Sequence, residues 1–251
     1  KDFSLNISGT YNYNKNNIDE LADDVTTGYS SEWASSATQP LYDYAFRVGS
    51  PVGLIRGYKC DGFYTTNDFN YDAATKTYTL KDNVPDEGTF MGTYNGRKNF
   101  IVKKTTKDSN GATTTTDANA FPGAVKIHDE NGDGKIDEND ITDLGKVTPA
   151  HTGGFNLAAR YKNIDFGATF TYAFGGHIYN ANALSSLYGN KDNSFGSNRL
   201  DIANKCYKIY SVENGELHPL TTPEELNAAN AGAEYWLPYY ENGVTLSTFV
   251  E

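Results

Sequence analysis

An acidic twelve-residue segment from Asp129 to Asp140, with the sequence DENGDGKIDEND, carries the clearest chemistry in the chain. Counted from Asp129, positions 1, 3, 5, 9 and 12 bear side-chain oxygens, and position 7 offers a backbone carbonyl. These residues are Asp129, Asn131, Asp133, Lys135, Asp137 and Asp140. A hard cation needs several oxygens converging from one short loop, and EF-hand loops have this spacing. We therefore predict a Ca²⁺ site.

Two further features decide what such a site would do. Gly134 holds the sixth position, where the chain must turn sharply, but Asp140 replaces the usual Glu at the twelfth. The segment 124–127 before the loop looks extended, so the paired helices of a calcium sensor are missing. We expect the cation to stiffen a loop. The alternative is an Asx-rich surface turn that binds no metal.

Two long strands follow the acidic loop, at 153–161 and 164–174. Apolar and polar residues alternate along both, over about the ten residues that a transmembrane β-strand requires. One face is predicted to meet lipid: Phe155, Leu157, Tyr161, Phe166, Phe170 and Tyr172. The other is predicted to face the lumen of a barrel and includes Arg160, Thr169 and Thr171. A soluble sandwich strand alternates in the same way, usually over a shorter run.

Three more strands are predicted at 2–14, 42–49 and 52–63, and the last of them alternates poorly. The connections are alternately long and short, with long loops at 15–41, 64–152 and 175–251. Outer-membrane barrels have short periplasmic turns and longer extracellular loops, so this asymmetry favours a barrel over a sandwich. The region after Tyr64 is expected to be largely irregular. Thr222-Pro-Glu-Glu225 predicts a short helix to about Asn230.

Composition excludes several classes of function. The 251 residues carry a net charge of −11, which argues against a nucleic-acid surface. The 19 tyrosines, 13 phenylalanines and 24 glycines indicate an aromatic-rich β protein. Mean hydropathy is −0.60 and no apolar run approaches 18 residues, so a helical membrane span is excluded.

No pattern in the chain indicates catalysis. Nucleophile motifs, phosphate-binding glycine loops and Cys/His clusters are missing, so we predict no catalytic residues and no enzyme. Cys60 and Cys206 either form one disulfide or remain unpaired thiols. One aromatic group could stack on a ligand or simply pack its loop against its neighbours. It consists of Tyr235, Trp236, Tyr239 and Tyr240.

Several blocks together resemble a known family. FPGAVKI at 121–127, the acidic loop, FNL at 155–157 and GGHIYN at 175–180 look like the C-terminal part of a SusC/RagA-type TonB-dependent outer-membrane transporter. GYKCDGF at 57–63 resembles another recurring block. The resemblance implies an all-β fold, an antiparallel transmembrane barrel of about 22 strands with a plugged lumen, of which this chain would supply about strands 15–19.

The same resemblance implies a function and partners. It predicts an importer of oligosaccharides, or less often peptides, in the outer membrane of a Gram-negative bacterium of the Bacteroidota. Energy would come through TonB, and a SusD-like surface lipoprotein would be the partner. Residues 1–251 would then be a piece of a longer protein, with lipid on one face and further strands at both sheet edges. The alternative is a secreted, calcium-stabilised β-sandwich module for glycan binding or adhesion.

Overall fold

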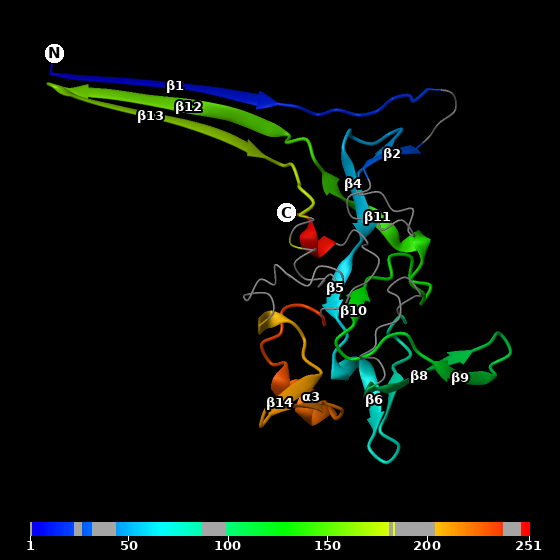
Figure 1. The fold of residues 1–251 in the computed structure, drawn as a ribbon. Coiled ribbons are helices and arrows are strands. Elements are labelled where there is room, and N and C mark those ends of the chain that lie inside the picture. Colours follow the sequence, from blue (N-terminus) through cyan, green and yellow to red (C-terminus); the bar gives the residue numbers. More distant parts are fainter. Residues whose placement is uncertain are drawn as a thin grey trace.

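The structure, a computed structural model, describes residues 2–22, 27–31, 44–86, 99–180, 183, 204–237 and 247–251. Most of their regular elements are β-strands, arranged as a long arm and a separate folded region (Figure 1). The predicted all-β, antiparallel fold class is confirmed. None of the helices in these ranges is long and apolar enough to cross a membrane.

The arm is a three-stranded antiparallel sheet made of β1 (Phe3–Tyr13), β12 (His151–Tyr161) and β13 (Ile164–Phe174), in the order β1-β12-β13. Its strands project far beyond the remainder of the chain (Figure 1). β12 and β13 are joined by a two-residue turn, because Tyr161 pairs directly with Ile164. The predicted strands 2–14, 153–161 and 164–174 are therefore confirmed to within two residues.

The prediction that 42–49 and 52–63 run beside these strands is wrong. Within the described residues they form β3 (Tyr44–Arg47), β4 (Leu54–Tyr58) and β5 (Cys60–Phe63), which lie outside the arm. β4 is only five residues long, and Leu54, Ile55 and Tyr58 are all buried. A strand this short and buried on both faces cannot cross a bilayer while presenting one face to lipid. β1 pairs with β12 instead.

The described part of the region 64–152, predicted to be irregular, contains regular strands. A four-stranded sheet has the order β11-β4-β3-β2, with β2 (Thr27–Ser31) and β11 (Ile141–Lys146) at its edges. A second has the order β6-β7-β8-β9 and comprises β6 (Phe69–Asp72), β7 (Thr77–Leu80), β8 (Ile101–Lys107) and β9 (Thr113–Asp117). β7 and β8 are parallel. β10 (Val125–Ile127) pairs with β5.

One apolar core joins these short strands. Tyr58, Tyr64, Tyr78 and Ile127 are at most 1% exposed, and they meet Trp236 from the far end of the sequence. The core therefore stabilises the region through contacts between residues far apart in the chain, and not through long strands. Short 3₁₀ turns complete it: η1 (Thr66–Asp68), η4 (Glu138–Asp140) and η5 (Ser247–Phe249).

A hairpin and one α-helix lie at the end of the folded region away from the arm (Figure 1). The hairpin pairs β14 (Tyr210–Glu213) with β15 (Glu216–Pro219). The helix α3 (Pro223–Ala229) begins with the predicted capping box, in which Thr222 accepts from the Glu225 amide and Glu225 accepts from the Thr222 amide. The predicted helix is confirmed.

Both long connections leave the arm at the same end, opposite the 162–163 turn. There the Asn14 amide donates to the Ala150 carbonyl at 2.9 Å, which extends the ladder beyond β1. Beyond β13, Ile178 and Glu251 exchange two backbone hydrogen bonds of 2.9 Å. The one-sided placement of the long connections thus holds, although the arm has three strands among the described residues where five were predicted.

Candidate functional site

The arm has one face of large apolar side chains. Directly paired residues share a face, so the registers of β1, β12 and β13 align one set across all three strands. Its most exposed members are Phe3, Leu5, Ile7, Tyr11, Tyr13, Phe155, Tyr161, Ile164, Phe166, Phe170 and Phe174. Each is 44–70% exposed, far more than a packed core allows. The six residues predicted for this face, Leu157 and Tyr172 included, all lie on it.

The length of this face matches a bilayer. Each strand of eleven residues spans ten intervals of about 3.4 Å, or about 34 Å. A barrel strand tilted by about 40–45° would then cover a height of about 25 Å, which is the height of the apolar band on outer-membrane barrels. The arm is therefore long enough to span the apolar part of a membrane.

Aromatic rings gather at the end of this face where the long connections begin. His151 stacks on Phe174 with ring centroids 4.8 Å apart, and Tyr13 lies 5.1 Å from the same imidazole. The Tyr11 hydroxyl forms a hydrogen bond of 2.7 Å with His151 Nδ1. Rings with an apolar body and a polar edge are enriched where hydrocarbon meets water. Their position fits one boundary of a membrane-spanning band.

Tyr172 is accommodated by a glycine on the neighbouring strand. A Cβ at Gly153 would lie 2.5 Å from the Tyr172 hydroxyl and 2.2 Å from the Thr10 carbonyl oxygen. The bare glycine lets the tyrosine cross β12, and its hydroxyl donates to that carbonyl at 3.3 Å. One side chain thus ties β13 to β1 across the middle strand.

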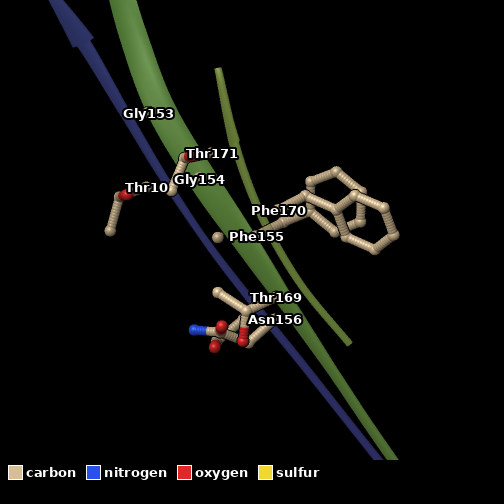
Figure 2. Close-up of a pocket in the computed structure, with 10 residues that line it drawn as sticks. Thr10, Gly153, Gly154, Phe155, Asn156, Thr169, Phe170 and Thr171 are labelled. Carbon is tan, nitrogen blue, oxygen red and sulfur yellow. The ribbon is translucent and has the colours of Figure 1, made fainter. Parts of the chain in front are cut away.

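The opposite face of the arm is polar. Arg160, Thr169 and Thr171 lie on it, as predicted, and Arg160 pairs with Asp165 at 3.5 Å near the turn. Figure 2 shows Thr10, Asn156, Thr169 and Thr171 on one side of the sheet and the rings of Phe155 and Phe170 on the other. The two rings stack with centroids 4.4 Å apart. The sheet is therefore two-faced along its whole length.

The acidic loop has the backbone of an EF-hand-type turn. Gly134 has φ of 79°, so its sharp turn favours glycine. The Asp129 carboxylate accepts from the amides of Gly132 and Gly134, both at 2.7 Å. The Asp133 carboxylate accepts from the Lys135 amide at 2.9 Å. The loop is thus shaped by its own carboxylates.

The donor chemistry of the loop suits calcium. Asp140 is fully buried and accepts from the amides of Glu130 and Asp137, at 3.0 and 2.7 Å. Each carboxylate oxygen retains a second lone pair for a cation. However, no three His, Cys, Asp or Glu side chains converge on a common metal position in the ranges that the structure describes. Calcium binding therefore stays a prediction.

Sequence reasoning missed Asp86, which connects the acidic loop to its surroundings. Its carboxylate is 9% exposed and accepts from the amides of Asn119 and Ala120, both at 2.9 Å. It also pairs with Lys104 at 2.5 Å, and its backbone bridges to Lys135 within the acidic loop. No local motif marks Asp86, because its partners are distant in sequence.

The aromatic group near the end of the chain is divided. Trp236 is 1% exposed and belongs to the core, and Tyr235 is half-buried against that core. The structure therefore supports the packing interpretation for Trp236. Tyr239 and Tyr240 lie outside the described residues.

Cys60 and Cys206 form no disulfide with each other in the structure. Burial raises the pKa of Cys206 to about 11, and burial also raises the pKa of Cys60. Both thiols are therefore held protonated at neutral pH and are poor nucleophiles.

An antiparallel sheet with one apolar and one polar face, and with its long connections at one end, is typical of the wall of a membrane β-barrel. Comparisons with known proteins agree. The chain is 43% identical over 58 residues to TonB-dependent receptor P26 of Formosa agariphila, which covers 23% of the chain and 6% of the relative. It is 27% identical over 186 residues to TonB-dependent receptor P39 of the same organism, covering 70% of the chain and 15% of the relative.

Among solved structures, that of the RagAB peptide transporter is similar over 100% of this chain and 19% of its own, at 15% identity and a TM-score of 0.48. No family model matches the chain. The chain spans less than a fifth of the length of each of these proteins. The curated relatives are both named TonB-dependent receptors, which agrees with the predicted resemblance to a TonB-dependent transporter.

Proposed function

We propose that the chain forms part of the barrel wall and the extracellular loops of a TonB-dependent importer in the outer membrane of a Gram-negative bacterium. Its cargo would be oligosaccharides or peptides, and a SusD-like surface lipoprotein would be its partner. The similarity to TonB-dependent receptors supports this class. Energy would reach the importer through TonB, and the chain itself would perform no chemistry.

The observation that carries the proposal is the bare apolar face of the arm. Its large side chains are 44–70% exposed and continue across three strands. Soluble monomers rarely expose apolar patches of more than a few hundred Å². Hydrocarbon would cover this face without leaving polar groups unpaired, since the polar side chains lie on the opposite face.

The alternative, a secreted β-sandwich, fits the arm less well. In a sandwich, a second sheet packs about 10 Å away and buries the apolar face. Among the described residues no other sheet lies against the arm, which projects away from the folded region (Figure 1). The one-sided long connections also favour the barrel.

Calcium would act structurally within this proposal. Asp129, Asn131, Asp133, Asp137 and Asp140 would supply side-chain oxygens, and Lys135 its carbonyl. The backbone bridge from Lys135 to Asp86 would then transmit the stiffness of the loop to β8. Tyr239, Tyr240 and the half-buried Tyr235 remain our candidates for contact with the cargo.

Deleting the gene for the full-length protein tests the function. We expect growth to fail on at least one oligosaccharide or peptide source, and a strain lacking TonB to fail on the same source. Growth on a free monosaccharide is the matched control. Recovery of the native protein in a soluble fraction, or unchanged growth on every source, would contradict the proposal.

A further inference from the structure

The apolar face of the arm ends, on the side of the long connections, in a group of four rings that we call the aromatic cluster. His151 lies at its centre, with ring centroids 4.8 Å from Phe174, 5.1 Å from Tyr13 and 5.9 Å from Tyr11. Tyr11, Tyr13 and Phe174 are 63%, 56% and 56% exposed. The rings therefore hold one another in place, yet the three outer ones keep more than half of their surface open.

The aromatic cluster also has polar atoms that no described residue satisfies. The Tyr11 hydroxyl forms its hydrogen bond of 2.7 Å with His151 Nδ1, which leaves Nε2 of the same imidazole. Within the part of the chain that the structure describes, neither this Nε2 nor the Tyr13 hydroxyl has a hydrogen-bond partner. A ligand that rests on the rings can therefore form hydrogen bonds at their edges as well.

A positive charge stands next to the aromatic cluster. The Asn14 amide donates to the Ala150 carbonyl at 2.9 Å and so continues the ladder beyond Tyr13. The strand period of two then places Lys15 on the same side of the sheet as Tyr13. Lys15 is exposed and has no ion-pair partner among the described residues. The edge of the aromatic cluster thus offers a free ammonium group.

The two ends of the arm differ in their balance of charge. At the end with the aromatic cluster, none of the three strands has an acidic residue within three positions in either direction. At the turn end, Arg160 and Lys162 are matched by Asp2 and Asp165. The whole chain carries a net charge of −11, so an unmatched cation at one end of the apolar face is a local exception. This end therefore suits an anionic group, whereas the turn end does not.

We infer that the aromatic cluster and Lys15 form a binding site for the phosphorylated sugar headgroup of a glycolipid of the lipid A type. The inference rests on the proposed function, which places this end in the outer leaflet of the outer membrane, where such glycolipids reside. A sugar ring would lie on the exposed ring faces, and its phosphate would pair with Lys15. The acyl chains would continue along the apolar face over Phe170. A phospholipid headgroup has a phosphate but no sugar ring to lie on the cluster.

Lipid binding to the full-length protein in detergent micelles tests the site. Native mass spectrometry would measure the bound fraction as diphosphoryl lipid A, the same lipid stripped of its phosphates, or phosphatidylglycerol is titrated. Lys15→Gln with Tyr13→Leu removes the charge and one ring of the site. Lys162→Gln with Tyr161→Leu is the matched control, because it removes a lysine that lies 5.3 Å over a tyrosine ring at the turn end of the same face.

The dissociation constant of diphosphoryl lipid A should rise about tenfold in Lys15→Gln with Tyr13→Leu, because a charge-assisted contact and a stacking surface are lost. The control variant should bind this lipid as the unmodified protein does. The lipid without phosphates should bind the unmodified protein about tenfold more weakly, and Lys15→Gln alone should weaken it no further. Phosphatidylglycerol should also bind about tenfold more weakly than diphosphoryl lipid A.

Four results would overturn the inference: no binding of diphosphoryl lipid A, equal binding of phosphatidylglycerol, no effect of removing the phosphates, or equal losses in the two double variants. The comparison of lipids uses the unmodified protein, so it decides the matter even if a variant fails to fold. Growth that depends on TonB, without selective lipid binding, would remove the site and leave the importer intact. Selective binding without a growth defect would do the reverse.

Discussion

Placing an arginine on each face of β13 in turn tests the membrane assignment most directly. Phe170 lies on the apolar face, 48% exposed and stacked on Phe155, and Thr169 lies beside it on the polar face. Because the two positions are adjacent, they share the same depth and backbone environment. Phe170→Arg and Thr169→Arg therefore differ only in the face that receives the charge.

The expected loss of stability follows from the depth of Phe170 within the apolar band. Phe170 is six residues from Ile164 and four from Phe174, so at about 2.5 Å of height per residue it lies about 15 Å and about 10 Å from the two ends of the apolar band. Arginine at this depth should cost about 2–4 kcal/mol. Loss of the Phe155 stack adds about 0.5–1.5 kcal/mol.

Phe170→Leu is the matched control, because it loses the stack but remains apolar. Thr169→Arg should cost less than about 1 kcal/mol, since its guanidinium reaches water in the lumen. Urea unfolding of the full-length protein in lipid vesicles would give the midpoint and slope for each variant. Equal destabilisation by Phe170→Arg and Thr169→Arg would refute the assignment of the two faces.

Three further predictions concern other parts of the molecule. Gly153→Ala should lower stability by about 1–3 kcal/mol through the clash with Tyr172 and the β1 backbone, whereas Gly167→Ala, whose Cβ would meet nothing within 4 Å, should be neutral in the same unfolding assay. Removing calcium with a chelator should speed proteolysis within 129–140. The double variant Asp129→Asn with Asp133→Asn should abolish that difference, whereas the control Asp82→Asn should preserve it. Identical cleavage with and without calcium would exclude calcium binding by the loop. Residues 1–251 expressed alone should fail to give a soluble monomer with one cooperative unfolding transition, and obtaining such a monomer would revive the secreted sandwich.

The strands that sequence predicted well are those whose pattern is local and uninterrupted. β12 and β13 alternate over their whole length and are joined by a two-residue turn, so their faces and register follow from the residues alone. The helix α3 could be predicted equally well, because its capping box and first-turn proline lie within four consecutive residues. In each case the information is contained in neighbouring positions.

The prediction failed for the folded region for the opposite reason: its structure depends on residues that are distant in the sequence. Its strands are three to seven residues long, and the parallel pair β7 and β8 joins Thr77 to Ile101 across a long connection. Their stability comes from a core that contains both Tyr58 and Trp236, and periodicity cannot reveal a core assembled from such distant parts of the sequence. The alternation around Tyr44 and Phe46 was misleading, because it belongs to a four-residue strand beside a buried neighbour.

Two physical requirements connect the arm to the rest of the proposed importer. Its apolar face is stable only against hydrocarbon or another apolar surface, and hydrocarbon cannot satisfy backbone hydrogen bonds. Yet β1 and β13 each have one edge without a partner strand among the described residues. If lipid covers the face, both edges must pair with strands other than these three. Pairing on both sides is what curves a sheet into a closed wall, and closure encloses the polar face. The alternation that makes one face suitable for lipid thereby turns the other face, with Arg160, Thr169 and Thr171, towards the interior of the wall.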